Sequence, residues 1–433
     1  MSPAIVIHPS YGRGEVIGSR ANGFELQVRF SAGVVRWVRR DQVEFEVGVI
    51  ASRSHPRQAN GLLKKPPYAR RIIEALRMGI VPDSEVARFT FGRDSEIADL
   101  KAWFGDQTDG ARFIVGTYGT GKTHLLHYLR TTALQAGYAV ALVEMDGSES
   151  PFSRPKRVYS QVVQNLEVPV PDKSTRQRFR DFIRRVKREG LLNDHPYFKH
   201  LQAQTGDDYV WNWIEGREDA HRPRTEEADY RDLPGLYNFG TAANIYCNLL
   251  SGLSWACRHP RIGLKGLLLI FDEAETLFTR ATYTASQSSY NFLEALIAVT
   301  NNASGMTEHP STTSYIYASH ALNVSFQYRD PSGLKLALAF TDISDLRYSS
   351  TLRSVESLDL DPLGDEALIS VFEQIRILYR KAYQFNTESL PLEDLYDSVA
   401  WQPGTTRLKI KGYVEALDLM RFYPHSPPGE ILV

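Results

Sequence analysis

Apolar and polar positions follow two different periods along the chain. Between residues 4 and 47, short runs such as AIVIHP, FELQVRF and VVRWVRR alternate apolar and polar residues and are separated by glycine-containing turns. This alternation predicts a small all-β module. From residue 67 onward, segments with helical spacing are interleaved with short continuous apolar runs, which are typical of buried parallel strands. The pattern therefore predicts an all-β module followed by an α/β domain.

The elements of the α/β part can be placed by residue number. The predicted strands are residues 113–115, 138–144, 266–271 and 335–340. The predicted helices are residues 68–78, 94–104, 155–166, 236–257, 290–301, 365–383 and 408–420, with a further helix that starts at His124. No strand is predicted after residue 345, so residues 346–433 are expected to form a helical lid.

Two stretches interrupt this pattern. Residues 50–66 are rich in small, polar, Pro and Gly residues without periodicity, which indicates a linker. Residues 170–235 are charged and partly helical, with a basic amphipathic part at 173–188 and an acidic part at 215–232. Such a basic helix could contact DNA or a neighbouring subunit, or be a solvated face. The predicted organisation is a β module at 1–49, a linker at 50–66, a core at 67–345 with an insertion at about 170–235, and a lid at 346–433.

Composition narrows the function classes. The chain has 433 residues, 42% hydrophobic and 23% charged, as expected for two or three globular domains. Its net charge of −1 gives no global polyanion-binding signature, so any nucleic-acid surface must be local. Two cysteines, Cys247 and Cys257, allow neither a disulfide framework nor a four-cysteine zinc site. No signal-peptide or membrane-spanning run is found, and we expect a cytoplasmic protein without a membrane partner.

The strongest chemical signal follows the first core strand. Residues 116–123 read GTYGTGKT and fit the phosphate-loop pattern G-x-x-x-x-G-K-[ST] between a strand and a helix start. Glycines let backbone N–H groups surround a phosphate, and the helix N-terminus adds its positive end. Lys122 would reach the β- and γ-phosphates of ATP, and Thr123 would bind Mg²⁺. The predicted nucleotide-binding residues are Gly116, Thr117, Tyr118, Gly119, Thr120, Gly121, Lys122, Thr123 and His124.

A second signal is the acidic pair that ends the strand at 266–271. Ligands bind at the carboxyl ends of strands in open α/β sheets, and Asp272 and Glu273 occupy such an end. We expect Asp272 to hold Mg²⁺ and Glu273 to polarise the water that attacks the γ-phosphate. Glu275 is close in sequence, and we expect it to contact these residues rather than the nucleotide.

Longer blocks resemble a known family. FGRDSE at 91–96, about 25 residues before the phosphate loop, resembles the segment that helps enclose the base in AAA+ ATPases, although Asp94 or Ser95 could simply cap a helix. Together with ARRIIEALRMGIVP, GTYGTGKTHLL and VEMDGSESPFSRPKRVYSQVVQNL, it resembles the ATP-binding P-loop proteins of BREX-type phage-defence systems, the BrxC/BrxD-like family. This resemblance runs from roughly residue 67 to 425. The N-terminal module instead resembles Tudor-like barrels appended to helicases and transcription-coupling factors.

The resemblance implies further site residues. In AAA+ proteins a polar residue at the end of the strand at 335–340 senses the γ-phosphate; Thr341 is the candidate and Asp342 the alternative, beside a simple strand-end turn. An arginine of the lid touches the β- and γ-phosphates, and Arg407 is the candidate. An arginine finger acting on a neighbouring subunit is not specified, and the candidates are Arg280, Arg347 and Arg353.

Taken together, the sequence predicts an AAA+-like P-loop core with a helical insertion and lid, preceded by a small β-barrel. The resemblance implies a Mg²⁺-dependent ATPase of an anti-phage defence system that acts on DNA or a DNA-bound complex, as a homo-oligomer and with other defence proteins. The alternative is an ATP-dependent switch or loader that regulates a nuclease, helicase or methyltransferase. In the barrel, phosphate contacts or a solvated face are open for Arg29, Arg36, Trp37, Arg39 and Arg40.

Overall fold

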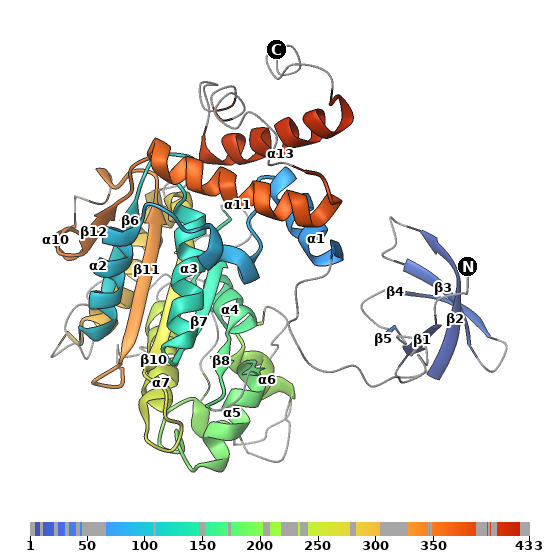
Figure 1. Ribbon diagram of the computed structural model, residues 1–433. Helices are drawn as coiled ribbons and strands as arrows, with labels where there is room; N and C mark the ends of the chain where they lie inside the picture. Colours follow the sequence, from blue (N-terminus) through green and yellow to red (C-terminus); the bar gives the residue numbers. More distant parts are fainter. Residues whose placement is uncertain are drawn as a thin grey trace. The chain divides into compact units, whose positions relative to one another are not determined.

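A computed structural model of the chain describes two compact units, Met1–Leu63 and Lys64–Val433 (Figure 1). The described residues are 5–8, 12–20, 25–30, 34–39, 44–45, 66–106, 110–146, 152–171, 175–201, 208–217, 233, 241–277, 283–303, 328–344, 346, 349–386, 396, 399 and 405–424. Of the predicted linker at 50–66, residues 50–65 lie outside them, as do residues 218–232 of the predicted acidic part at 215–232.

The first unit contains a five-stranded antiparallel sheet in the order β4-β3-β2-β1-β5. Its strands are β1 (Ile5–His8), β2 (Gly12–Arg20), β3 (Glu25–Phe30), β4 (Val35–Arg39) and β5 (Glu44–Phe45). One face packs a small apolar cluster of Val6, Leu26, Val28, Phe30 and Val38. Arg29, Arg36 and Trp37 are exposed, as a surface contact would require, and the side chains of Arg39 and Arg40 lie outside the described part. A Tudor-like barrel stays a prediction.

The second unit is built on a five-stranded parallel sheet in the order β12-β6-β11-β10-β7. Its strands are β6 (Ala111–Val115), β7 (Tyr138–Glu144), β10 (Gly266–Asp272), β11 (Leu334–Phe340) and β12 (Glu356–Asp359). Every residue of β10 and β11 is buried, which explains their continuous apolar sequences. The predicted α/β class with a central parallel sheet is confirmed. The strand β12, at one edge of the sheet, is an addition to the prediction.

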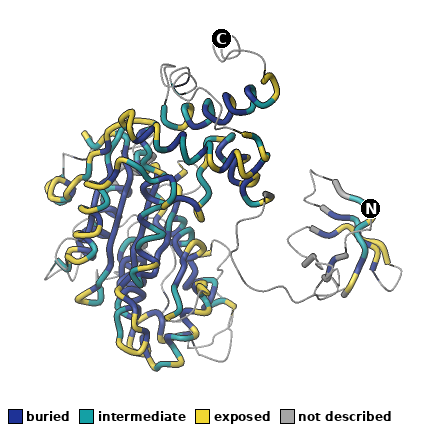
Figure 2. Tube along the Cα trace, viewed as in Figure 1, coloured by how far each residue is buried: buried dark blue, intermediate teal, exposed yellow. Residues whose placement is uncertain are grey.

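Helices cover both faces of this sheet because alternate strand residues point to opposite sides. On one face, α2 (Asp94–Gly105) and α3 (Lys122–Gln135) pack on strand residues such as Ile114 and Leu268. On the other face, the neighbouring positions Phe113 and Leu267 contact the cluster that α4 (Pro155–Asn165), α7 (Thr241–Arg258) and α8 (Tyr283–Thr300) complete. Figure 2 shows the buried strands between these half-exposed helices.

The stretch predicted as an insertion packs on the core. It contains β9 (Arg176–Gln177), which pairs with β8 (Val168–Pro169) just before it, and then α5 (Phe179–Arg188), the short helix η4 (Phe198–His200) and α6 (Asp208–Ile214). The apolar stripe of α5, which includes Phe182 and Val186, joins the same buried cluster as α4 and α7. Trp211 and Trp213 are buried as predicted packing residues. Of the basic side chains of α5, Arg184 and Arg188 are exposed, whereas Arg185 and Lys187 are partly buried and donate to the backbone oxygens of Ile262 and Phe198.

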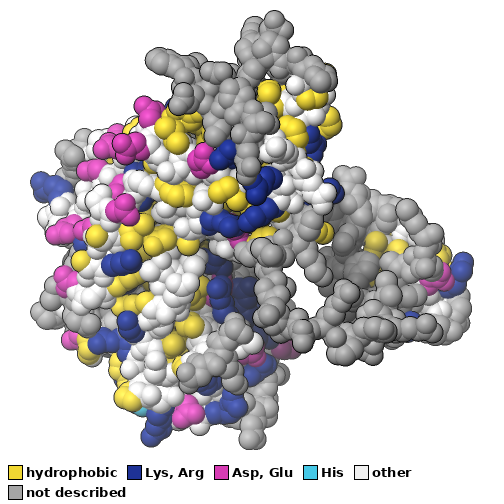
Figure 3. Space-filling view, viewed as in Figure 1, with side chains coloured by type: hydrophobic (Ala, Val, Ile, Leu, Met, Phe, Trp, Pro, Cys, Tyr) yellow, Lys and Arg dark blue, Asp and Glu magenta, His cyan; other side chains and the backbone are white. Residues whose placement is uncertain are grey.

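Charge is unevenly spread over the surface. Figure 3 shows Lys and Arg side chains gathered in the centre of one face of the second unit, whereas Asp and Glu gather toward its upper left. This pattern agrees with a chain whose net charge is only −1 but whose charged patches are local. None of the helices in the described part of the chain has the length and apolar character that a membrane span requires.

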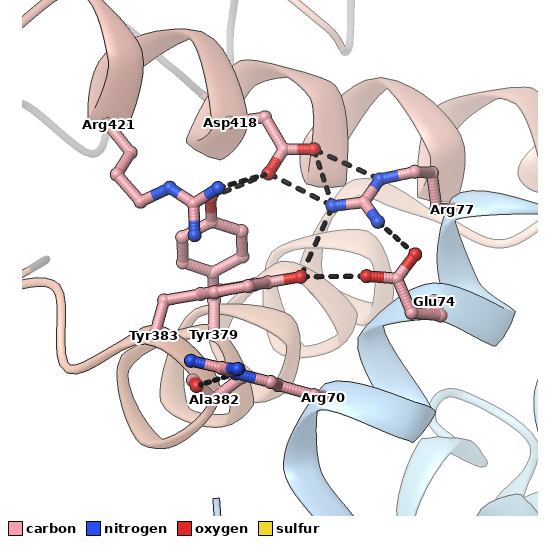
Figure 4. A network of polar contacts seen from close by, with 8 residues as sticks. All are labelled: Arg70, Glu74, Arg77, Tyr379, Ala382, Tyr383, Asp418 and Arg421. Atoms are coloured by element: carbon pink, nitrogen blue, oxygen red, sulfur yellow. Dashed lines mark hydrogen bonds and ion pairs between the residues drawn. The ribbon is translucent and has the colours of Figure 1, made fainter. Parts of the chain in front are cut away.

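Helices of the segment predicted as a lid form one cluster with the first helix of the unit. Helices α11 (Asp365–Tyr383) and α13 (Thr406–Phe422) share an apolar core with α1 (Pro66–Arg77). Between them, Asp418 accepts hydrogen bonds from Arg77 Nη2 at 2.7 Å and from the Tyr379 hydroxyl at 2.6 Å (Figure 4). Tyr383 donates to Glu74 at 2.9 Å, which adds a second link between α1 and α11. Residues more than 300 positions apart in sequence thus form one packed element.

Replacing Asp418 by alanine should weaken this cluster. The change removes the acceptor of the Tyr379 hydroxyl and leaves Glu74 as the carboxylate partner of the half-buried Arg77, so we expect the free energy of unfolding to fall by about 2 kcal/mol. Urea denaturation followed by tryptophan fluorescence measures it. Glu373→Ala, which breaks an ion pair with Arg376 within α11 and removes a carboxylate more exposed than that of Asp418, is the control and should cost no more than about 0.5 kcal/mol. Equal losses in the two variants would contradict the proposed role of Asp418.

Candidate phosphate-binding site

The predicted site residues directly follow neighbouring parallel strands, at the carboxyl ends of those strands. The register pairs Val115 of β6 with Phe340 of β11, and Phe271 of β10 with Leu338 of β11. Because the strands are parallel, the residues that follow each of them come out on the same side. The phosphate loop after β6, Thr341 after β11 and the acidic pair at the end of β10 therefore meet, with β11 between the loop and the acids.

The phosphate loop depends on its glycines. Gly119 and Gly121 have φ values of +85° and +99°, in the left-handed region that other residues avoid. A Cβ on Gly116 would lie 2.7 Å from Thr120 Oγ1 and 2.9 Å from the backbone oxygen of Leu360. Gly121 then caps α3, which begins at Lys122. The sequence motif thus produces a tight backbone turn directly before a helix N-terminus, which is the arrangement that binds phosphate.

Lys122 lies in the curve of this loop and reaches the next strand. Its Nζ donates to the backbone oxygen of Gly116 at 2.6 Å and lies 3.5 Å from Thr341 Oγ1. Thr123 and Tyr118 are exposed beside it. Asp342, the alternative to Thr341, instead binds its own turn, with its carboxylate 2.8 Å from the backbone N of Ser344. Of the two candidates, Thr341 is therefore the one that the fold brings to the loop.

Arg93 binds the phosphate loop to the helix and strand that pack against it. Its guanidinium is buried and donates at 2.7 Å to each of three acceptors: Glu96 Oε1, the backbone oxygen of Thr120 and the backbone oxygen of Asp361. One side chain thus joins α2, the loop and the end of β12. In this structure α2 begins at Asp94 with Arg93 at the N-cap position, so neither Asp94 nor Ser95 acts as the cap. Sequence reasoning singled out the FGRDSE box but missed this function of its arginine.

The acidic end of β10 carries two carboxylates with different surroundings. Asp272 is buried and accepts the backbone N–H of Glu273 at 2.9 Å, while Glu273 is exposed and has a φ of +53°. Partial burial raises the pKa of Glu273, and the carboxylates of Asp272, Glu144 and Glu275 raise it further, against the opposing effect of Lys122. A carboxyl with a raised pKa at a strand end is suited to accept a proton.

Glu275 connects this end to Thr341. It lies on the short helix η6 (Ala274–Leu277) that follows β10, and the Thr341 hydroxyl donates to its Oε1 at 2.5 Å. Lys122, Thr341 and Glu275 therefore form a continuous polar chain from the loop to the acidic strand end. This agrees with the expectation that Glu275 contacts site residues.

Within the segment predicted as a lid, Thr405 rather than Arg407 contacts the loop in this structure. A Cβ on Gly119 would lie only 2.3 Å from Thr405 Cβ, so the N-terminus of α13 rests directly on the phosphate loop. Arg407 is exposed and its Nε donates to the backbone oxygen of Gly79 at 3.2 Å, near the end of α1. Among the arginine-finger candidates, Arg353 is exposed on α10 (Ser350–Arg353), and Arg280 and Arg347 lie outside the described residues.

His124 anchors α3 to the preceding segment. Its Nε2 is 2.9 Å from Thr90 Oγ1, and that hydroxyl already donates its proton to the backbone oxygen of Val86 at 2.8 Å. His124 Nε2 must therefore carry the proton and donate to Thr90. Burial lowers the pKa of His124 to about 4, with smaller effects from His127 and Arg93. The side chain is neutral at physiological pH, so it positions the helix and adds no charge to the site.

These residues fit a nucleotide that carries Mg²⁺. The loop leads directly into the N-terminus of α3 and holds the Lys122 ammonium, and Asp272 provides a buried carboxylate at the end of a strand of the same sheet. Within the described residues, no group of three or more His, Cys, Asp or Glu side chains could hold a metal on its own. Mg²⁺ normally needs only one or two carboxylates, since phosphate oxygens and water fill its other positions. The site thus suits a metal that is bound together with phosphates.

Changing His124 to glutamine should reduce the pH dependence of stability. Because the pKa of His124 is lowered on folding, only the unfolded chain takes up its proton as pH falls from about 6.5, and stability is lost toward pH 4. Glutamine can keep the hydrogen bond to Thr90 but does not titrate. Between pH 7.5 and 5.5 we expect wild type to lose about 1 kcal/mol more than His124→Gln in urea denaturation. Equal losses would show that His124 is charged in the folded protein.

Comparison with known proteins agrees with this geometry. Residues 65–205, from α1 through the phosphate loop to the insertion, match the family model described as BREX system ATP-binding protein BrxC/D. The match covers about a third of the chain and ends before β10. No curated protein matches the chain. The match confirms, over residues 65–205, the resemblance to the BrxC/D family of BREX system ATP-binding proteins.

Proposed function

We propose that the chain is a Mg²⁺-dependent ATP hydrolase. The observation that carries this proposal is the position of Lys122, whose ammonium group lies inside the glycine loop and extends to Thr341 on the next strand. Asp272 and Glu273 end the strand beyond it. A cation in a phosphate loop, with two acids at the end of a strand close by in the same parallel sheet, is the arrangement that phosphoryl transfer from ATP requires.

The proposed mechanism assigns each residue one task. Backbone N–H groups of the loop and Lys122 bind the phosphates, and the N-terminus of α3 adds its positive end. Thr123 and Asp272 would hold Mg²⁺, which when bound supplies positive charge against the phosphate oxygens. Glu273 accepts a proton from the attacking water, for which its raised pKa is suited. Positioning and charge carry the reaction, and the chain supplies no covalent intermediate.

The family match supports a function in phage defence with other proteins of such a system. We propose that hydrolysis is coupled to DNA or a DNA-bound complex and that subunits assemble, with Arg407 or a finger arginine acting on the phosphates after rearrangement of the lid. The contact of Thr405 with Gly119 supports such coupling, because the lid touches the loop directly. The same contact favours the alternative, a switch in which ATP binding moves the lid and thereby regulates a partner enzyme.

Two variants separate binding from hydrolysis. Lys122→Ala should lose ATP binding in a fluorescent-nucleotide titration, because it removes the ammonium group that the loop holds for the phosphates. Glu273→Gln should bind ATP with wild-type affinity but hydrolyse it 10²- to 10³-fold more slowly, since the amide cannot accept the proton. Stimulation of wild-type hydrolysis by DNA favours a DNA-coupled ATPase, and tight binding without turnover favours the switch. ATP binding that is unaffected by Lys122→Ala would refute the site.

The pH profile of hydrolysis should depend on Glu144. Its carboxylate, at the end of β7, is one of the charges that raise the pKa of Glu273. Glu144→Gln removes that charge, so Glu273 stays deprotonated at lower pH and the acidic limb of kcat should move to lower pH. Steady-state ATPase rates across pH measure this limb. A limb that stays fixed, or moves to higher pH, would show that Glu273 is not the titrating base.

A further inference from the structure

The Thr341 hydroxyl has one proton, and the structure shows where it goes. A carboxylate can only accept hydrogen bonds, so the 2.5 Å contact with Glu275 Oε1 requires Thr341 to be the donor. The ammonium of Lys122 can only donate, and its Nζ lies 3.5 Å from the same Oγ1. Thr341 therefore accepts from Lys122 and donates to Glu275, which fixes the direction of its O–H bond.

The sheet fixes the backbone position of Glu275, the residue that accepts this hydrogen bond. Its backbone belongs to η6, directly after β10, and β10 pairs with β11, whose end carries Thr341. Glu275 Oε2 is buried, and it has no hydrogen-bond partner among the described residues. Within the described residues, the Glu275 carboxylate therefore depends on the hydrogen bond from Thr341. Breaking that bond costs free energy, because it leaves the carboxylate without this donor.

A terminal phosphate competes for the same proton. Phosphate oxygens accept hydrogen bonds, as the carboxylate does, and Thr341 has a single proton to give. A nucleoside diphosphate has no phosphate at the γ position, so its binding leaves the bond between Thr341 and Glu275 intact. A nucleoside triphosphate gains the Thr341 bond only when Glu275 loses it. The free-energy cost of breaking the Thr341–Glu275 bond therefore lowers the affinity for the triphosphate and leaves the affinity for the diphosphate unchanged.

We propose that Glu275 is a positioning residue that competes with the terminal phosphate for the Thr341 proton and thereby lowers the preference of the site for a nucleoside triphosphate over a diphosphate. This inference rests on the proposed function, since it requires the phosphates to bind at Lys122. It gives Glu275 a task that is distinct from that of Glu273: Glu273 acts on water, and Glu275 acts through Thr341. It also means that triphosphate binding breaks the hydrogen bond to Glu275 and so removes a contact of η6.

The test compares affinities for two nucleotides by isothermal titration calorimetry in Mg²⁺ buffer. The probes are ADP and the non-hydrolysable triphosphate AMP-PNP. Glu275→Ala frees the Thr341 proton, so the ratio of AMP-PNP affinity to ADP affinity should rise about tenfold over wild type, the size expected for release of one charge-assisted hydrogen bond. In a Thr341→Val background the same substitution should leave the ratio unchanged, because no proton remains to be released.

Removal of a negative charge could by itself favour the more highly charged nucleotide, so a matched variant controls for it. Glu144→Ala removes a carboxylate from the same end of the sheet, and it should change the ratio much less than Glu275→Ala. Glu275→Gln, a weaker acceptor of similar shape, should give a smaller rise and serves if the alanine variant does not fold. Thr341→Ser keeps the hydroxyl and should restore the response to Glu275→Ala.

Three results would overturn the inference: equal effects on both nucleotides, a ratio in Glu144→Ala as high as in Glu275→Ala, or a Glu275→Ala effect that persists with valine at position 341. Failure of the proposed function would look different. In that case AMP-PNP would not bind wild type, or would bind Lys122→Ala equally well, whatever residue stands at 275.

Discussion

The parallel pairing of β6, β11 and β10 is the constraint on which the candidate site depends. It places the ends of three strands side by side, so that residues from positions 116, 272 and 341 meet although they are far apart in sequence. The continuous burial of β10 and β11 keeps this pairing in register, because a shift of one residue would turn each apolar side chain toward the wrong cluster. The geometry of the site is thus fixed by the hydrophobic core below it.

Polar contacts then fix the parts that the core does not reach. Arg93 joins the phosphate loop to α2 and to the end of β12, and a buried guanidinium with three acceptors leaves the loop little freedom. The lid is attached from the other side, where Thr405 rests on Gly119 and the Arg77–Asp418 contact holds α13 to α1. Thr405 is therefore the point where α13 contacts the loop, and α13 is in turn packed on the first helix of the unit. These contacts connect the loop to α13 and, through it, to α1.

Much of this architecture could be predicted from sequence, for reasons that particular elements make clear. Tyr138–Glu144 and Asp365–Tyr383 have the predicted bounds because their apolar patterns are continuous and strongly periodic. The strand β12 was missed because its sequence, ESLD, is polar and largely exposed at the sheet edge. The packing of α1 with the last two helices, the bonds of Arg93 and the identity of Thr341 as the partner of Glu275 were also beyond prediction, since they depend on partners that only the folded chain brings close. The sequence identified the chemical groups, and the fold decides their partners.

The central claim is that the phosphates of ATP bind at the carboxyl ends of the parallel strands. Hydrogen–deuterium exchange of the full chain, with and without MgAMP-PNP, tests it most directly because it reports on each segment of backbone. The account predicts slower exchange in the loop and the start of α3, residues 116–124, and at the strand ends near residues 272–275 and 341, with a further decrease at the start of α13, where Thr405 lies on the loop. Unchanged exchange in residues 116–124, with protection confined to other parts of the chain, would contradict it.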